Sequence, residues 1–410
     1  MTPQNHSLKQ LFQQEYAKMV AVISKLFGLQ HIEIAEDIVS ETFLVASETW
    51  GLKGMPENPV AWLYTVAKNN TQYYLRRNKL FAEKIAPTLK KMNEVNGDSI
   101  EIDFSGEHIK DSQLQMLFAV CNPVIASEAQ IGLALRILCG LGIEEIAEAF
   151  LSNKETINKR LFRAKEKLRQ ENVKMEFPPE HLLNERLDNV LHVIYLLFNE
   201  GYYSVTHNEI LRKDLCLEAL RLGLLLTQFE QTNQPKVNAL VALMCYHASR
   251  FTARLDSSGS PILYDQQDEE LWDRSLIAQG NHYLDRSAVG DEVSAYHIEA
   301  GIAQWHCRKE DTPEKWNAIL QLYDVLLRLN DSPSVALSRA YVLYKAKGSK
   351  AAIAETEQLS LTNNHFYFTL LGELYKTIDV GKAKSYLQQA KALAKTETDK
   401  YVIQQKIERL

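Results

Sequence analysis

The sequence predicts an all-α protein, and three observations support this prediction. Glycine (17) and proline (11) are scarce among the 410 residues, so few positions interrupt a helix. Apolar residues recur every three or four positions along nearly the whole chain, which is the period of an amphipathic helix. No stretch alternates apolar and polar residues as a strand would. The length predicts two or more domains.

The first 85 residues contain three predicted helices. The first spans 7–28, and the second spans 31–50. One face of the second helix carries carboxylates and no Lys or Arg, and these carboxylates are Glu33, Glu36, Asp37, Glu41 and Glu48. The third helix spans 59–80, with Asn58 as its N-cap and Pro59 at its first position. This segment therefore pairs an acidic helix with one whose second half is basic.

The third helix has a composition that suits single-stranded nucleic acid. Between Ala61 and Lys91 there are seven Lys and Arg against Glu83 alone, and tyrosines and asparagines lie among them. Aromatic rings stack on unpaired bases, and basic side chains hold phosphates. The alternative is an ordinary amphipathic helix with Tyr73 and Tyr74 half-buried.

A second helical segment is predicted over residues 114–175, after a linker at 86–113 whose second half is acidic. It ends in two helices joined by a turn. Ser152 or Asn153 is the predicted N-cap of the second of these helices. The second of these helices has an apolar face made by Ile157, Leu161, Ala164 and Leu168. Its outward face carries seven Lys and Arg against two Glu. This arrangement is typical of a helix-turn-helix in the major groove, although a surface hairpin with a solvated basic face has the same pattern.

The remainder of the chain is predicted to be a helical array over residues 184–410. Pro178 and Pro179 separate it from the helix-turn-helix. Near its end, Tyr344 and Ala352 are repeated by Tyr375 and Ala383, an offset of 31 residues. Helix–turn–helix repeats of about 34 residues are of the tetratricopeptide type, which this array loosely resembles.

The charge balance argues against a protein that binds DNA alone. The formal net charge is −6; residues 1–175 hold 21 basic and 21 acidic residues, which leaves 25 against 31 for residues 176–410. A lone DNA binder is usually more basic. The five cysteines form no CxxC motif and indicate buried thiols in a reducing compartment. We find no secretion signal and no membrane-length apolar run, so a soluble cytoplasmic protein is expected.

No motif of an enzyme or a cofactor site is present in the sequence. It has no GxGxxG, Walker A, HExxH or GxSxG pattern. His306 and Cys307 form the nearest approach to a metal or thiol pair, but further ligands are missing at suitable spacing, which favours core packing. We therefore expect a protein that is not an enzyme and needs no cofactor.

The order of these segments resembles that of the extracytoplasmic-function sigma factors of bacterial RNA polymerase. Three stretches carry the resemblance and together cover residues 8–170 in the family's order: Ala35–Phe43, Asn58–Arg77 and Ile143–Leu168. They are similar to the polymerase-docking segment, the promoter-melting helix and the domain that reads the minus-35 element. The resemblance implies a sigma-70 family sigma factor with region 2 over 1–85 and region 4 over 114–175. Core RNA polymerase and promoter DNA are the implied partners.

The resemblance also implies roles for individual residues. Polymerase would bind Asp37 and Glu41, while Phe43 belongs to the core. The minus-10 element would be held by Asn69, Asn70, Tyr73, Arg76 and Arg77. The minus-35 duplex would be contacted by Lys154, Thr156, Asn158, Lys159, Arg160 and Arg163. In such an interface Asn and Arg read base edges, and Lys mostly holds phosphate.

A second resemblance concerns the extension. Val193–Tyr202, Leu211–Leu222 and the stretch from Asp265 to Asp273 are similar to a sigma-factor group in which a tetratricopeptide-like domain follows region 4. Asn199–Gly201 is either a packing position or a contact surface. We expect the extension to be regulatory and to dock on the DNA-reading segments. Two rival hypotheses stand beside this one: a polymerase-independent helix-turn-helix regulator with a repeat sensor domain, and an interaction scaffold inactive in transcription.

Overall fold

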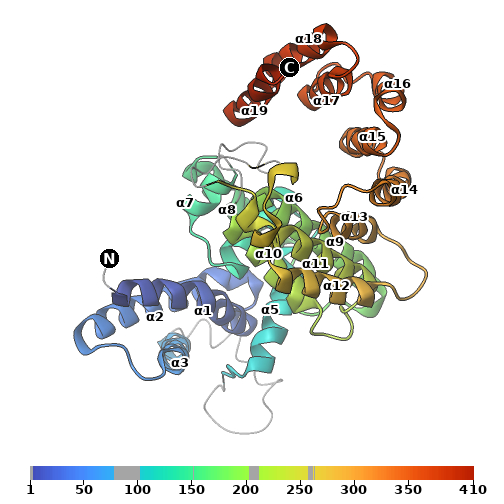
Figure 1. Cartoon of the computed structure of the whole chain (residues 1–410). Coiled ribbons are helices and arrows are strands. Elements are labelled where there is room, and N and C mark those ends of the chain that lie inside the picture. The colour runs from blue at the N-terminus through green and yellow to red at the C-terminus, as the bar shows by residue number, and fades with distance from the viewer. Residues whose placement is uncertain (1–2, 78–101, 151, 203–211, 257–261, 263) are drawn as a thin grey trace. The chain divides into compact units, whose positions relative to one another are not determined.

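The computed structural model describes residues 3–77, 102–150, 152–202, 212–256, 262 and 264–410 (Figure 1). Within these ranges every regular element is a helix, which confirms the all-α prediction. The chain divides into two compact units, Met1–Leu196 and Leu197–Leu410, and the division falls inside helix α9 (Glu180–Tyr202). Each unit is described by itself.

The first unit begins with three helices close to their predicted bounds. They are α1 (Pro3–Phe27), α2 (Ile32–Lys53) and α3 (Pro59–Arg77), with a 3-10 turn, η1 (Leu29–His31), before α2. Gly28 ends α1 at a φ of 78°, a value that favours glycine. Asn58 caps α3 as predicted, because its Oδ1 accepts a hydrogen bond from the Ala61 amide at 3.0 Å.

The second part of this unit contains the helix-turn-helix. Its elements are α5 (Gly106–Val120), α6 (Ser127–Leu133), the π-helical turn η2 (Ala134–Leu138), α7 (Ile143–Ala149) and α8 (Lys154–Gln170). Asn153 is the cap of α8, with its Oδ1 2.8 Å from the Thr156 amide. We predicted a linker as far as residue 113, but α5 already begins at Gly106. The Ser105 hydroxyl accepts from the His108 amide and starts the helix there.

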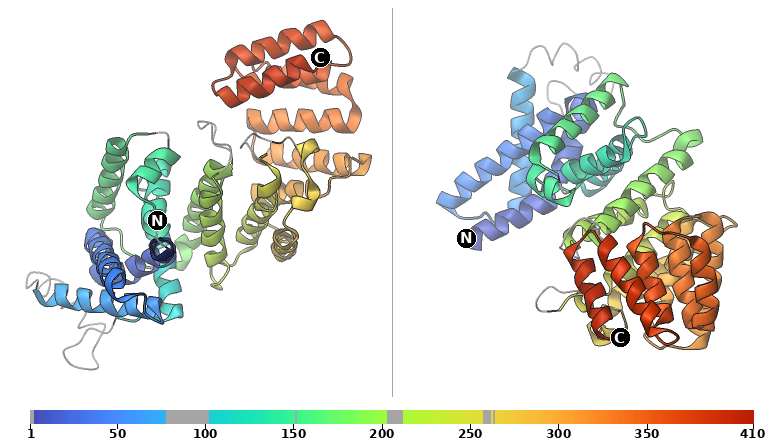
Figure 2. Two further views of the ribbon diagram at one scale, coloured as in Figure 1. Left: turned by 60° about the vertical axis from the view of Figure 1, so that its left-hand side comes forward. Right: turned by 90° about the horizontal axis from the view of Figure 1, so that it is seen from above.

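Apolar side chains join these two parts. Val22 of α1 packs with Ile102 and Ile109 in one buried cluster. Tyr64 of α3 stacks on Phe104 with ring centroids 4.7 Å apart. In the two views of Figure 2 the α1–α3 helices and the α5–α8 helices lie side by side. The described part of the first unit is therefore one packed body.

The start of α9 belongs to the first unit. The Asn189 amide donates to the Cys121 carbonyl oxygen at 2.6 Å and to Gln130 Oε1 at 2.8 Å. Upstream, the helix-turn-helix ends at Gln170 and α9 begins at Glu180, directly after Pro178 and Pro179. The two prolines thus separate helices, as predicted.

The second unit has a core centred on α11 (Pro235–Ala248), whose residues are nearly all buried. Around it lie α10 (Lys213–Leu226), α12 (Arg274–Ser287) and α13 (Ala295–Trp305). Short 3-10 turns occupy η3 (Phe251–Ala253), η4 (Tyr264–Gln266) and η5 (Glu269–Leu271). Gly201 is a packing position: a Cβ there would lie 2.8 Å from both the Arg212 carbonyl oxygen and Cys216 Sγ.

The last helices form a stack in which each contacts its neighbours in sequence (Figure 1). They are α14 (Pro313–Leu329), α15 (Pro333–Lys347), α16 (Ser349–Leu359), α17 (His365–Tyr375), α18 (Val380–Leu393) and α19 (Glu397–Glu408). The two alanines of the predicted repeat, Ala352 and Ala383, are completely buried. A Cβ on Gly372 would lie 2.6 Å from Leu387 Cγ, so α17 and α18 approach closely there.

Candidate nucleic-acid interface

Helix α3 separates its apolar and polar side chains onto different faces. Leu63, Ala67 and Thr71 are fully buried against the unit. Asn69, Tyr73 and Arg76 are exposed, and their spacing of four and three residues places them on one face of the helix. Tyr73 is 66% exposed, an unusual position for so large an aromatic ring. We call Asn69, Tyr73 and Arg76 the α3 stripe.

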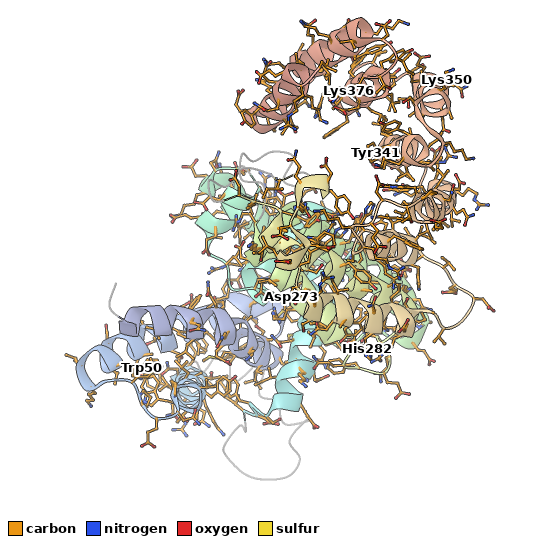
Figure 3. The ribbon with its side chains drawn as sticks, viewed as in Figure 1. Trp50, Asp273, His282, Tyr341, Lys350 and Lys376 are labelled. Atoms are coloured by element: carbon orange, nitrogen blue, oxygen red, sulfur yellow. The ribbon has the colours of Figure 1, made fainter. Side chains whose placement is uncertain are left out.

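Two other residues predicted for the minus-10 element lie outside this stripe. Asn70 is half-buried, and its amide nitrogen is 3.4 Å from the Thr42 hydroxyl of α2. Arg77 is the last helical residue of α3, and its side chain lies outside the described structure. Tyr74 also turns inward and meets Phe27 edge to face, with ring centroids 5.7 Å apart. Trp62, near the helix start, packs on Trp50 with ring centroids 5.2 Å apart; Trp50 is labelled in Figure 3.

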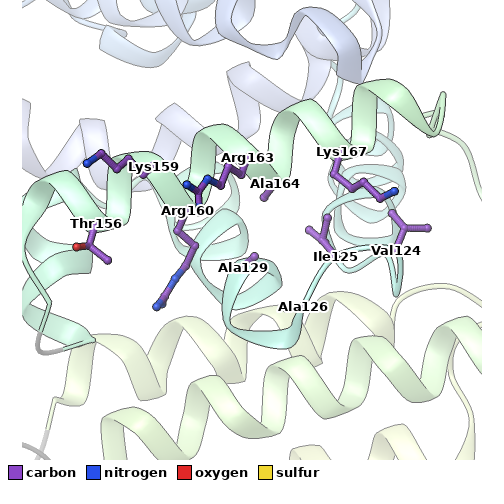
Figure 4. Close-up of a pocket in the computed structure, with 10 residues that line it drawn as sticks. All are labelled: Val124, Ile125, Ala126, Ala129, Thr156, Lys159, Arg160, Arg163, Ala164 and Lys167. Atoms are coloured by element: carbon purple, nitrogen blue, oxygen red, sulfur yellow. The ribbon is translucent and has the colours of Figure 1, made fainter.

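A basic groove runs along one side of α8 (Figure 4). Its volume is about 520 Å³, and its other wall is the loop at Val124–Ala126 and the start of α6. Four residues predicted for the minus-35 duplex line it together with Lys167: Thr156, Lys159, Arg160 and Arg163. No carboxylate is among the residues that line this groove. An anionic backbone would therefore meet only cations and uncharged side chains there.

The lining residues differ in how freely they can move. Arg163 and Lys159 are exposed. Arg160 is half-buried, and its guanidinium carbon lies 5.4 Å from the Phe150 ring centroid, a cation–π distance. Arg160 therefore has a packing role as well as a charge.

The other two predicted minus-35 residues lie away from the groove. Lys154 forms a 2.6 Å ion pair with Glu144 of α7, and both side chains are exposed. Contact with Lys154 lowers the pKa of Glu144. Asn158 is exposed on the same helix, beside Phe162, which is 66% exposed. Sequence reasoning did not single out Phe162, although an apolar residue outside the helix's apolar period is visible in the sequence.

The carboxylates of the acidic helix α2 lie in two different environments, one exposed and one buried. Asp37 and Glu41 are exposed, one turn apart, and Leu44 beside them is 59% exposed. Phe43 is buried, as predicted. Glu36, which the sequence places on the same acidic face, is only 7% exposed and forms ion pairs with Arg136 and Lys165. These partners are 100 and 129 residues away in sequence, so no local pattern could have revealed them.

His306 and Cys307 belong to a cluster of rings and cations in the second unit. The Arg250 guanidinium carbon lies 5.5 Å from the Tyr264 ring centroid and the Lys315 ammonium nitrogen 5.2 Å from it, and both cations are buried. Burial lowers the pKa of His306 to about 3 and raises that of Cys307. Among the described residues no group of three His, Cys, Asp or Glu could hold a metal ion. The surroundings of this pair are those of a packed core.

Comparison with known proteins identifies the class. Residues 11–81, which include most of α1 and all of α2 and α3, match the sigma-70 region 2 family. Residues 186–288 match a family of unknown function, DUF6596. An uncharacterized protein of Rhizobium meliloti (strain 1021) is 33% identical over 401 residues, covering 96% of this chain and 94% of that protein. No solved structure matches the chain.

The fold and the region 2 match define a transcription factor that acts in promoter recognition. The chain belongs to the same family as the rhizobial protein and is a sigma-70 family sigma factor. Core RNA polymerase and promoter DNA are the partners of this family. None of the described helices is long and apolar enough to cross a membrane.

Proposed function

We propose that this sigma factor belongs to the extracytoplasmic-function group and directs initiation by contacting two promoter elements with core RNA polymerase. Helix α3 takes the melted minus-10 element, and α8 takes the minus-35 duplex. The observation that carries the proposal is the α3 stripe, which lies on the helix that the region 2 match contains. A ring that is 66% exposed, flanked by an amide and a guanidinium, suits an unpaired base and its phosphate.

The groove of α8 supports the second contact. Its cations line one wall without a carboxylate, which favours a phosphate backbone. Thr156 and Asn158 are exposed in the first half of α8, where a recognition helix meets base edges. Lys154 is the first residue of α8 and lies at the same end of the helix.

Docking on polymerase is assigned to the outward side of α2. Asp37 and Glu41 are exposed carboxylates, and the exposed side chain of Leu44 beside them offers an apolar contact. Core polymerase would supply the affinity that the even charge balance of residues 1–175 lacks. This explains how a chain with net charge −6 could act at a promoter.

For the helical extension we propose a regulatory or protein-interaction role with a tetratricopeptide-like stack. The supports are the successive packing of α14 to α19 and the buried alanines of the repeat. We further propose that the extension docks on the DNA-reading segments, on the basis of its size and acidic balance. Limited proteolysis tests this: a slow release of the second unit is expected, and its immediate release as a freely tumbling domain would contradict docking.

In-vitro transcription with core polymerase tests the central proposal. Tyr73→Ala removes one stacking ring, worth about 1–3 kcal/mol, and should reduce open-complex formation by roughly 5- to 150-fold. Tyr401→Ala is the matched control, because Tyr401 is 58% exposed on α19 and outside the interface. Equal activity of the two variants would contradict the role of the α3 stripe. Specific duplex binding without core would favour a polymerase-independent regulator, and absence of both activities would favour a scaffold.

A further inference from the structure

A cluster of ion pairs connects α2 with the helix-turn-helix. Glu36 Oε1 lies 3.0 Å from Arg136 Nε, and Glu36 Oε2 lies 2.6 Å from Lys165 Nζ. Next to it, Glu33 is 3.4 Å from Arg169 and 3.8 Å from Lys165. We call Glu33, Glu36, Arg136, Lys165 and Arg169 the Glu36 cluster.

Glu36 is the centre of this cluster. It is 7% exposed, and a carboxylate removed from water in this way is stable only with close cationic partners. Both partners come from the second part of the unit: Arg136 from η2 and Lys165 from α8. Arg169 adds a hydrogen bond from its Nε to the Gln30 carbonyl oxygen at 3.0 Å. Region 2 thus holds α8 by charge, on a side of the helix that does not line the basic groove.

This contact fixes how far apart the two proposed DNA-reading helices can be. Along α2, Thr42 lies six positions after Glu36 and contacts Asn70 of α3. Along α8, Lys165 lies seven positions after Asn158. A path from Asn158 to Asn70 runs along these two helical segments and through the Lys165–Glu36 and Thr42–Asn70 contacts. At a rise of about 1.5 Å per residue, and with the side chains of both contacts included, its length is on the order of 40 Å.

The two promoter elements lie farther apart than this path. The positions minus-35 and minus-10 are about 25 base pairs apart, which is roughly 85 Å at about 3.4 Å per base pair. The arrangement seen here cannot therefore place α8 and α3 on both elements at once. This step rests on the function proposed above.

We propose that the first unit is in a closed arrangement and that the Glu36 cluster is the latch that holds it. Initiation then requires Glu36 to separate from Arg136 and Lys165 so that α8 can move away from α2. The apolar contacts of Val22 with Ile102 and Ile109 also join the two parts. A change of charge at Glu36 isolates the contribution of the latch from that of these contacts.

Spin-label distance measurements on the full-length chain test the latch. Thr65→Cys on α3 and Gln170→Cys on α8 place labels at two exposed positions. The five native cysteines are all buried, so the introduced thiols are the ones labelled. We expect a single short distance for the labelled protein and a longer one, by 20 Å or more, as the main population in Glu36→Lys. Glu36→Gln, which keeps the side-chain volume, should show both distances.

Glu48→Lys is the matched control, because Glu48 is an exposed carboxylate on the same helix and is not in the cluster. It should keep the short distance. Circular dichroism establishes that each variant is folded; if Glu36→Lys is not, the Glu36→Gln distances decide. A folded Glu36 variant with only the short distance would overturn the latch, and so would a long distance in the unaltered chain.

A second measurement separates the latch from the proposed function. Core polymerase and promoter DNA added to the labelled chain should shift the short distance to the long one. A short distance that persists in an initiating complex would overturn the latch. If Glu36→Lys opens the unit but neither it nor the unaltered chain initiates transcription, the latch is supported and the proposed function fails.

Discussion

Arg163 and Arg160 offer the sharpest test of the basic groove, because they share a surface and differ in packing. Arg163 is exposed, so Arg163→Ala removes a cation and little else. Loss of one phosphate contact should reduce the slope of log affinity against log salt concentration by about 0.9. If Arg163 also reads a base edge, the affinity falls by about 1–3 kcal/mol. The free energy of unfolding should stay within about 0.5 kcal/mol.

Arg160→Ala should affect both binding and stability. Its guanidinium carbon lies 5.4 Å from the Phe150 ring centroid, so the variant also loses a cation–π contact worth about 0.5–1 kcal/mol. Fluorescence anisotropy of holoenzyme on a labelled promoter fragment, at several salt concentrations, gives the slope. Urea unfolding of the free protein gives the stability.

The two variants contradict the reasoning in different ways. If Arg163→Ala leaves both the salt slope and the minus-35 footprint unchanged, α8 does not lie where we place it. If the two variants are equally stable, the Phe150 contact contributes nothing. Lys174→Ala is a control for charge alone, because Lys174 lies after α8 and does not line the groove.

Three further predictions concern stability. Asn153→Ala removes the cap of α8 and should lower the free energy of unfolding by about 1 kcal/mol in urea, whereas Asn153→Gly should cost only a few tenths. Gly372→Ala should cost about 1–3 kcal/mol, because its Cβ would lie 2.6 Å from Leu387 Cγ; Gly51→Ala in α2, with nothing within 4 Å, should instead stabilise the chain by up to about 1 kcal/mol. His306 has a pKa of about 3 when folded and about 6.5 when unfolded, so the unfolded chain binds more protons in that window. Stability should therefore fall as the pH drops below 6.5, by up to about 2 kcal/mol at pH 5, and His306→Gln should reduce this loss in pH-dependent thermal unfolding.

Local sequence patterns predicted the helices and their caps well. Asn58 and Asn153 cap α3 and α8 because a cap depends on residues two or three positions away. The period of α3 was equally informative, since the buried set of Leu63, Ala67 and Thr71 leaves the α3 stripe on another face. The start of α5 was missed because Ser105 and Gly106 also suit a turn.

Long-range contacts could not be predicted from these patterns. Glu36 was placed on the acidic face of the second helix, yet its partners lie 100 and 129 residues away and reach it only through the packing of the whole unit. Asn70 is one residue from Asn69 and was assigned the same role. A turn of about 100° between neighbouring helix positions directs it to Thr42 instead.

The stack from α14 to α19 has a consequence for how the second unit loses its structure. Contacts there join helices that are close in sequence, so each helix depends mainly on the one before and the one after. The stability of such an array is close to a sum over adjacent pairs. Helix α19 makes its main contacts with α18 alone, so its amide hydrogens should exchange with solvent before those of α15 to α18. Unfolding of the stack then begins at α19 and proceeds one helix at a time.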